Sequence, residues 1–339
     1  MQSMIVLGIE SSCDDTSAAV VADGRKVLSC VTFGQEAFHR KFSGVVPEIA
    51  SRRHMEAIEP TVRSALEEAG ISAKDLDGLA VTSGPGLVGS ILVGLAFGKA
   101  LAFSLGIPFV GVDHVRAHLA AALLADPPAE FPFIGLAVSG GHTHLFLVKD
   151  IDDLGLIGRT LDDAAGECFD KIAKALGLGY PGGPAIERFA EGADSKAFKL
   201  PKPKLHDGTL DFSFSGLKTA TLNQMKNLPR PIPEPTAKNL AASFQQAIVD
   251  VLVSKLLDAV KKTALNRVVV AGGVAANRTL YLNMAAAAKK ADINLFFAPT
   301  AYCTDNAAMV AVAGSRLLEK GKTSDLGLNS YANLQQNTP

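Results

Sequence analysis

The chain has 339 residues, 48% of them hydrophobic and 20% charged, with a formal net charge of -1. This length suits about two globular domains, and the balanced charge argues against a general nucleic-acid coat protein. The four cysteines are far apart and form no C-x-x-C pair, so neither a zinc ribbon nor a disulfide framework is indicated. A reducing cytoplasm is therefore expected.

Neither the start of the chain nor its most apolar window predicts a membrane protein. The first ten residues have no basic region and only a short apolar run, which does not make a signal peptide. The window 86–112 is rich in glycine and interrupted by Lys99. A buried helix followed by a strand explains this window better than a membrane span.

The first part of the chain predicts strands followed by helices. Short apolar runs predict strands at residues 5–9, 18–22 and 26–32, and Asp23-Gly24 is a hairpin signal between the last two. Apolar residues at three- and four-residue steps predict a helix over residues 47–69. A strand at 79–82, a glycine turn at 83–89, a helix to about 105 and a strand at 108–112 follow.

A histidine pair comes directly after this strand. His114 and His118 are four residues apart, so on a helix both side chains project from one face and can share a metal ion. Asp113 is suited to cap the start of that helix. The alternative is a pair that solvent or the core satisfies.

The proline-rich stretch 126–132 predicts a boundary, after which the order of elements begins again. We expect strands at 133–138, 144–148 and 154–160, helices at 164–176 and 184–191, a lysine- and proline-rich insertion at 193–218, and a helix at 236–264. A strand at 268–271, a glycine turn at 272–277 into a helix, a strand at 293–297 and a helix at 304–318 complete the chain.

The pattern βββαβα thus occurs twice, which predicts an α/β protein of two duplicated lobes around a cleft. The lobes are expected at residues 1–130 and 131–325, with a tail at 326–339. Glycine turns at 139–141 and 272–273 could then cradle the phosphate and adenosine of one nucleotide. A plain doubly wound sheet is the alternative architecture.

Motifs along nearly the whole chain resemble those of one family within the actin, sugar kinase and Hsp70 ATPase superfamily, the bacterial tRNA threonylcarbamoyl transferase subunits. They include Gly8-Ile-Glu-Ser-Ser-Cys-Asp-Asp-Thr16, Gly44-Val-Val-Pro-Glu48, Gly84-Pro-Gly-Leu-Val-Gly89, Val138-Ser-Gly-Gly-His-Thr143, Asp211-Phe-Ser-Phe-Ser-Gly-Leu-Lys218, Ala271-Gly-Gly-Val-Ala-Ala-Asn277 and Cys303-Thr-Asp-Asn306. The histidine stretch also matches the family signature.

The resemblance implies transfer of threonylcarbamoyl from threonylcarbamoyl-adenylate to N6 of the adenosine 3′ of the anticodon, in tRNAs reading codons that begin with A. It implies that His114, His118 and Asp305 hold one divalent metal ion, iron(II) in the family and with zinc also compatible. Asp305 could equally be a helix N-cap. The donor and its adenine nucleotide are expected at Ala137, Val138, Ser139, Gly140, Gly141, Asp170, Gly183, Glu187 and Asn277.

The reaction also needs a base and a surface for tRNA. Glu10 and Asp14 are the candidate catalytic carboxylates, because the adenosine amine must lose a proton. Lysines and arginines at residues 39–41, 52–54 and 196–204 could meet tRNA phosphates. The resemblance implies two partners, a shorter actin-like paralogue and a small P-loop ATPase, with exposed apolar residues of the first-half helices as docking face. A YrdC-like enzyme would make the donor.

Three other functions fit parts of the pattern. A zinc endopeptidase would need the glutamate of H-E-x-x-H, and Val115 stands in its place. An ATPase or small-molecule kinase of the same superfamily would have similar glycine turns but no evident use for the histidine pair. A catalytically inert scaffold would not need these ligand residues at all.

Overall fold

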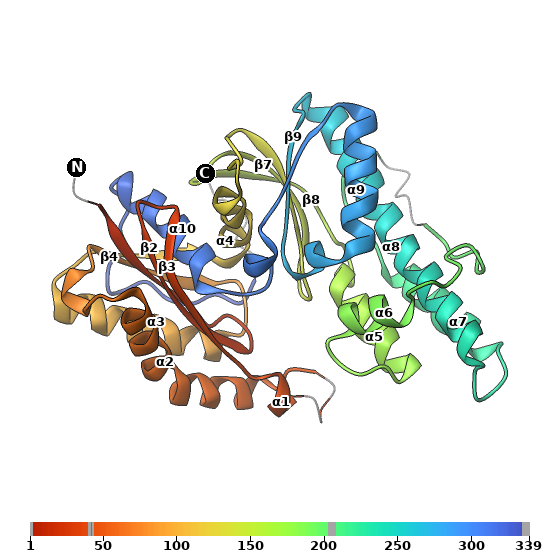
Figure 1. Ribbon diagram of the computed structural model, residues 1–339, viewed down its shortest axis with the longest axis horizontal. Helices are drawn as coiled ribbons and strands as arrows, with labels where there is room; N and C mark the ends of the chain where they lie inside the picture. Colours follow the sequence, from red (N-terminus) through yellow and green to blue (C-terminus); the bar gives the residue numbers. More distant parts are fainter. Residues whose placement is uncertain (1–2, 40–41, 43, 203–207, 334–339) are drawn as a thin grey trace. The chain divides into compact units, whose positions relative to one another are not determined.

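The computed structural model describes residues 3–39, 42, 44–202 and 208–333. The chain forms two compact units (Figure 1). The first unit comprises Met1–Glu130, Asp150–Asp153 and Ala298–Pro339, and the second comprises Phe131–Lys149 and Leu154–Phe297. Each unit has its own sheet, so the two are described separately.

The first unit is built on a five-stranded sheet with the strand order β3-β2-β1-β4-β5. Strands β1 (Ile5–Glu10), β2 (Asp15–Ala22) and β3 (Lys26–Gly34) pair antiparallel, while β4 (Gly78–Gly84) and β5 (Phe109–Asp113) run parallel to β1. Asp23 and Gly24 both adopt positive φ at the β2–β3 turn, which confirms the predicted hairpin.

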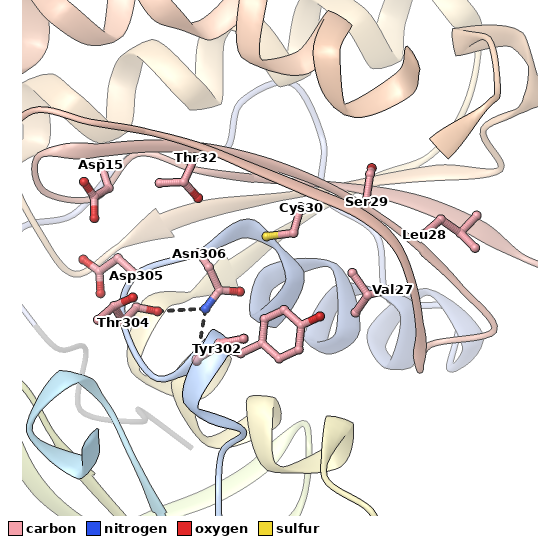
Figure 2. Close-up of a pocket in the computed structure, with 11 residues that line it drawn as sticks. Asp15, Val27, Leu28, Ser29, Cys30, Thr32, Tyr302, Thr304, Asp305 and Asn306 are labelled. Atoms are coloured by element: carbon pink, nitrogen blue, oxygen red, sulfur yellow. Dashed lines mark hydrogen bonds between the residues drawn. The ribbon is translucent and has the colours of Figure 1, made fainter. Parts of the chain in front are cut away.

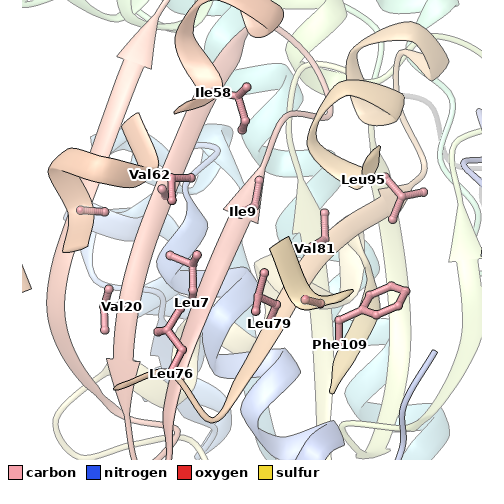
Figure 3. Close-up of a cluster of buried hydrophobic side chains, with 13 residues drawn as sticks. Leu7, Ile9, Val20, Ile58, Val62, Leu76, Leu79, Val81, Leu95 and Phe109 are labelled. Carbon is pink, nitrogen blue, oxygen red and sulfur yellow. The ribbon is translucent and has the colours of Figure 1, made fainter. Parts of the chain in front are cut away.

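Helices cover both faces of this sheet. On one face, α2 (Pro47–Ala69) and α3 (Val88–Leu105) pack over Leu7, Ile9 and Val81 (Figure 3). On the other face lies α10 (Ala307–Glu319), which packs on β1, β2, β4 and β5. A Cβ on Gly8 would lie 2.3 Å from the carbonyl oxygen of Ala307, so only glycine permits this close approach.

Short elements complete the first unit. They are α1 (Glu36–His39), η2 (Ala73–Asp75), α4 (His114–Ala120), η3 (Ala121–Leu124) and η5 (Thr300–Tyr302). The strand β5 leads directly into α4, because Asp113 is both the last residue of the strand and the N-cap of the helix. This junction delivers the histidine pair.

The second unit contains a five-stranded sheet with the order β10-β9-β6-β7-β8. Its strands are β6 (Phe133–Val138), β7 (Thr143–Asp150), β8 (Asp153–Arg159), β9 (Arg267–Ala271) and β10 (Asn294–Phe297). Its helices are α5 (Ala165–Leu176), α6 (Gly182–Phe189), α7 (Ser215–Lys226), α8 (Glu234–Thr263), η4 (Gly273–Ala276) and α9 (Arg278–Ala291).

The two sheets have the same topology. In each, three strands that are consecutive in sequence lie side by side, and two later strands extend the sheet in parallel on the other side of the first strand. The duplicated α/β architecture is thereby confirmed, and the single doubly wound sheet is wrong. Sequence periodicity also predicted α2 with its observed ends, whereas it missed α1 and α7.

The last helix differs from its prediction in two respects. It begins at Ala307 rather than at 304, because Asn306 caps it by accepting a hydrogen bond from the Met309 amide at 3.0 Å. It also packs on the first sheet, so residues 298–325 group with the first unit rather than with the expected second lobe. The small side chains of α10, such as Gly314 against Ala80, allow that packing.

Two described helices, α3 and α8, are long and apolar enough to cross a membrane by length and composition alone. Most of α8 is buried within the second unit, and α3 packs against α2 and β4 in the first. Their apolar character is thus explained at least in part by packing within each unit.

Candidate metal centre and nucleotide-binding turns

The histidine pair lies on α4 in the first unit. Asp113 Oδ1 accepts a hydrogen bond from the Arg116 amide at 2.9 Å and so fixes the start of this seven-residue helix. His114 and His118 are both buried, and their rings meet edge to face with centroids 4.6 Å apart. The predicted common face is therefore present.

Asp305 joins the two histidines from a distant part of the chain. Its Oδ1 lies 3.1 Å from His118 Nε2 and 3.5 Å from His114 Nε2. One ligand atom from each of the three side chains lies within 4.8 Å of the others. Since Asn306 caps α10, the alternative role of Asp305 as N-cap is wrong. The three side chains form a group that could hold one metal ion.

The hydrogen bonding of His118 tests whether this group suits a metal ion. Neither ring nitrogen of His118 has a hydrogen-bond partner among the described residues, although both are buried. The short approach of Asp305 to Nε2 therefore lacks hydrogen-bond geometry. Buried polar atoms are normally paired, and a cation that takes the Nε2 lone pair would satisfy this one. Two imidazoles and a carboxylate are a donor set that iron(II) and zinc both accept.

Glu10 contacts His114 at Nδ1, the ring nitrogen that does not face Asp305. Its Oε2 lies 3.0 Å from His114 Nδ1 and accepts from Thr82 Oγ1 at 2.6 Å, while Oε1 accepts from the Ser12 amide at 2.5 Å. A proton on Nδ1 that faces this carboxylate keeps the lone pair on Nε2, where a metal can accept it. Burial alone would raise the pKa of Glu10, but the charge and hydrogen bond of His114 outweigh burial and lower it.

The surroundings of Glu10 do not suit the catalytic base that the sequence predicts. A fully buried carboxylate with three donors around it is poorly placed to collect a proton from a substrate, so we assign Glu10 to orienting His114. Asp14 lies in the turn between β1 and β2 and is half-buried. Sequence reasoning gave no role to Ser12 or Thr82. Ser12 lies within the motif Gly8 to Thr16, whereas Thr82 ends the predicted strand 79–82 and carried no signal of its own.

A cavity of about 490 Å³ adjoins Asp305 within the first unit. It lies between strands β2 and β3 and the segment before α10, with Asp15 and Asp305 at one end and Tyr302 toward the other (Figure 2). Burial and the negative charge of Asp305 raise the pKa of Asp15 to about 7. The predicted metal ligand Asp305 thus forms part of the acidic end of the cavity.

Three glycine-bearing segments meet at the end of β6 in the second unit. The turn that follows Val138 is closed by a hydrogen bond from the Ser139 amide to the His142 carbonyl at 2.8 Å. A Cβ on Gly166 would lie 2.5 Å from the Ser139 carbonyl oxygen, and one on Gly272 would lie 2.4 Å from that of Val138. The structure therefore brings the two predicted glycine turns together beside the start of α5.

The other residues predicted to bind the threonylcarbamoyl donor lie at, or form hydrogen bonds to, the starts of α6 and α9 in the same unit. Asp170 accepts from the Gly182 amide at 2.7 Å, next to Gly183. Glu187 accepts from the Arg278 amide at 2.6 Å, and Asn277 caps α9 by accepting from Leu280 at 2.9 Å. These bonds give Asp170, Glu187 and Asn277 structural roles whether or not they touch a ligand.

The residues predicted to contact tRNA differ in their exposure and in whether other side chains already pair with them. His54 is buried and bonded to Thr16 and to the Cys13 carbonyl, and Arg53 pairs with Glu56, so neither is a free phosphate contact. Arg52, Lys196 and Lys199 are exposed. Residues 40, 41, 203 and 204, which belong to two of the predicted basic segments, lie outside the described residues.

Solved structures of other proteins show the same fold. HypF from T. kodakarensis superposes with a TM-score of 0.64 at 14% identity and covers 94% of this chain and 48% of its own. The 2-hydroxyisocaproyl-CoA dehydratase activator from Clostridium difficile, with bound ADPNP, has a TM-score of 0.52 at 12% identity and covers 95% and 99%. Such distant likeness shows the fold alone, and that fold is the actin-like ATPase fold.

Sequence comparison then gives the family. Residues 26–312 match the family described as tRNA N6-adenosine threonylcarbamoyltransferase. Relatives of that name from Pelobacter propionicus and Clostridium perfringens strain 13 are 53% and 48% identical. The alignments cover 97% and 99% of this chain and 96% and 99% of theirs. The chain belongs to the tRNA N6-adenosine threonylcarbamoyltransferase family.

Proposed function

We propose that this protein transfers the threonylcarbamoyl group of threonylcarbamoyl-adenylate to N6 of the adenosine 3′ of the anticodon, in tRNAs reading codons that begin with A. The observation that carries the proposal is the convergence of His114, His118 and Asp305, because a kinase or ATPase of this fold has no evident use for it. Family membership supplies the substrate class.

The chemistry is an acyl transfer to nitrogen. The adenosine N6 attacks the carbamoyl carbonyl carbon, a C–N bond forms, the C–O bond of the mixed anhydride breaks, and AMP leaves. The anhydride is already activated, so the protein has to orient donor and amine and to stabilise charge on the carbonyl oxygen and the phosphate. The proton lost from N6 goes to a base, for which we propose Asp14.

His114, His118 and Asp305 would hold one divalent ion, and we propose iron(II), with zinc as the alternative for the same ligands. A bound ion supplies Lewis acidity and an anchor for the threonine part of the donor. Glu10 keeps the proton of His114 on Nδ1, so that Nε2 points its lone pair toward Asp305.

In the second unit, we propose that the turn at Ala137 to Gly141 contacts the donor phosphate through backbone amides. At Gly140 and Gly141 an added Cβ would meet no atom within 4 Å, so space for a ligand exists beside them. Asp170, Gly183 and Glu187 would lie near the ribose, and Asn277 near the adenine.

The proposed partners are a shorter actin-like paralogue and a small P-loop ATPase, with tRNA as acceptor, in the cytoplasm. Support for a docking face comes from α2 and α3, where Met55, Leu92 and Phe103 are exposed, Phe103 by 75%. A contiguous apolar patch marks an interaction surface, and we propose that these three side chains belong to one. We assign the paralogue to this face and tRNA phosphates to Arg52, Lys196 and Lys199.

Mass spectrometry of tRNA nucleosides tests the function. Cells depleted of the protein are complemented with wild type or with the His114→Ala, His118→Ala double variant. Loss of threonylcarbamoyladenosine that only wild type restores is the expected result. Rescue by the double variant would remove the metal ligands from the mechanism. An unchanged nucleoside level on depletion would point to the kinase or scaffold function instead.

Binding to the paralogue tests the docking face separately. Phe103→Glu on α3 should abolish co-purification with it, because a charge replaces the most exposed apolar side chain of the face. Leu282→Glu on α9 is the matched control, since Leu282 is 54% exposed but lies in the second unit. Equal binding by both variants would place the partner elsewhere.

A further inference from the structure

The segment after α10 lies along the strand that leads to the histidine helix. We call residues 324–332 the strap. The Ser324 amide donates to the Phe109 carbonyl at 2.8 Å, and Ser324 Oγ accepts from the Gly111 amide at 3.0 Å. The strap therefore bonds to the free edge of β5 shortly before that strand ends at Asp113.

Leu328 fixes the middle of the strap. Its side chain packs against the hydrophobic cluster beneath α3, and a Cβ on Gly111 would lie 2.4 Å from Leu328 Cδ2. The Leu328 carbonyl accepts a hydrogen bond from Lys99 Nζ on α3. These contacts tie the strap to both β5 and α3.

Tyr331 closes the strap over the turn between β4 and α3. Its amide donates to the Ser83 carbonyl at 3.1 Å, and the Gly86 amide donates to the Ala332 carbonyl at 3.2 Å. Gly84 has a φ of +145°, and a Cβ there would lie 2.4 Å from the Tyr331 carbonyl oxygen. The glycines of this turn thus make room for the strap.

The Tyr331 side chain reaches the N-cap residue of the histidine helix. Its hydroxyl donates to Asp113 Oδ2 at 2.9 Å, while Asp113 Oδ1 accepts from the Arg116 amide. Burial and the charge of Asp113 raise the pKa of Tyr331, so the hydroxyl keeps the proton that it donates. Asp113 precedes His114 directly, and its carboxylate is held on both sides.

A second connection runs through the turn that the strap covers. The Leu87 amide, next to Gly86, donates to the Ser12 carbonyl at 2.8 Å. Ser12 Oγ in turn lies 3.1 Å from His114 Nδ1. The strap is therefore linked to His114 both through the helix cap and through the turn that supports Ser12.

We propose that Tyr331 is a positioning residue for the proposed metal centre, holding Asp113 and with it the start of α4 in the orientation that directs His114 toward Asp305. The inference rests on the proposed metal site. It assigns the strap a role in metal affinity, beyond the packing of a terminal segment. Groups hydrogen-bonded directly to a metal ligand typically contribute about 10- to 100-fold in affinity, and Tyr331 acts one residue further out, so we expect the lower end of this range.

Cobalt(II) binding to metal-free protein, followed by its visible absorption, tests the proposal. Tyr331→Phe removes only the hydroxyl and should weaken cobalt binding about tenfold and alter the spectrum. Tyr281→Phe on α9 makes the same chemical change at an exposed position and should bind as wild type does. Equal affinity and spectrum for Tyr331→Phe and wild type would overturn the proposal.

Two further arms separate the possible failures. If wild type and the His114→Ala, His118→Ala variant bind cobalt equally, or neither binds it, the proposed metal site itself is refuted. If Tyr331→Phe does not fold, hydrogen exchange of wild type decides, because coupling is reciprocal. Zinc should then slow exchange at the Gly86 and Tyr331 amides, and unchanged exchange there would overturn the role of the strap.

Discussion

Replacing Glu10 by glutamine should weaken metal binding while leaving the fold intact. The glutamine oxygen has to face the Ser12 amide, which can only donate and lies 2.5 Å from Oε1 in the native protein. The glutamine NH₂ then faces His114 Nδ1 and Thr82 Oγ1, at the position of Oε2. Because the NH₂ group donates a hydrogen bond, His114 Nδ1 has to accept it with its lone pair. The proton of the neutral imidazole then moves to Nε2.

That proton occupies the atom that would bind the metal. His114 Nε2 is the ring nitrogen that faces Asp305, at 3.5 Å, and a protonated nitrogen is no ligand. We therefore expect a loss of about 10- to 100-fold in affinity for zinc or cobalt. The thermal unfolding of the metal-free variant should change little, because the shape and most hydrogen bonds remain. Glu10→Ala, by contrast, removes the buried acceptor of the Ser12 amide and the Thr82 hydroxyl and the carboxylate beside His114, and should lower the free energy of unfolding by about 3 kcal/mol or more.

Competition titration with a chromophoric chelator measures the affinity, and calorimetry the stability. Glu191→Gln, at an exposed position in the second unit, makes the same substitution away from the site and serves as control. Wild-type affinity in Glu10→Gln would refute the assignment of Glu10 as the residue that sets the His114 tautomer.

Three further predictions concern stability. Zinc at about 100 times its Kd should raise the free energy of unfolding of wild type by about 2.7 kcal/mol, with no rise in the His114→Ala, His118→Ala variant. Gly8→Ala should destabilise the protein by about 1 to 3 kcal/mol in denaturant titration, because its Cβ would meet α10, whereas Gly216→Ala has open space and should not. Burial and the Arg159 charge lower the pKa of His144 to about 4 from 6.5. Between pH 4 and 6.5, His144 is therefore protonated in the unfolded chain but mostly neutral in the folded protein. Wild type should therefore lose up to roughly 3 kcal/mol as pH falls from 6.5 to 4, a loss that His144→Gln should lack; equal pH profiles would contradict this.

Local patterns in the sequence were sufficient for several elements. The apolar steps of α2, the Asp23-Gly24 hairpin and the cap-and-histidine run at residues 113–118 each depend on neighbours within a few residues. Backbone geometry converts such short spacings directly into faces and turns. The order of these elements also predicted the duplicated fold, since βββαβα units pair in few ways.

The joining of distant residues was decided only by the tertiary structure. Asp305 meets the histidines because α10 packs on the first sheet, which small residues on both surfaces allow. The family resemblance implied this ligand set, but the spacing of the residues alone could not. Glu10 at the end of β1 faces His114, which follows β5, although β4 lies between the two strands. Tyr331 after α10 faces Asp113 at the end of β5. The sequence by itself determined the local elements and the types of residue that can act as ligands. The packing of helix on sheet decided which of those side chains meet, because contact between remote segments depends on the shape of the whole core.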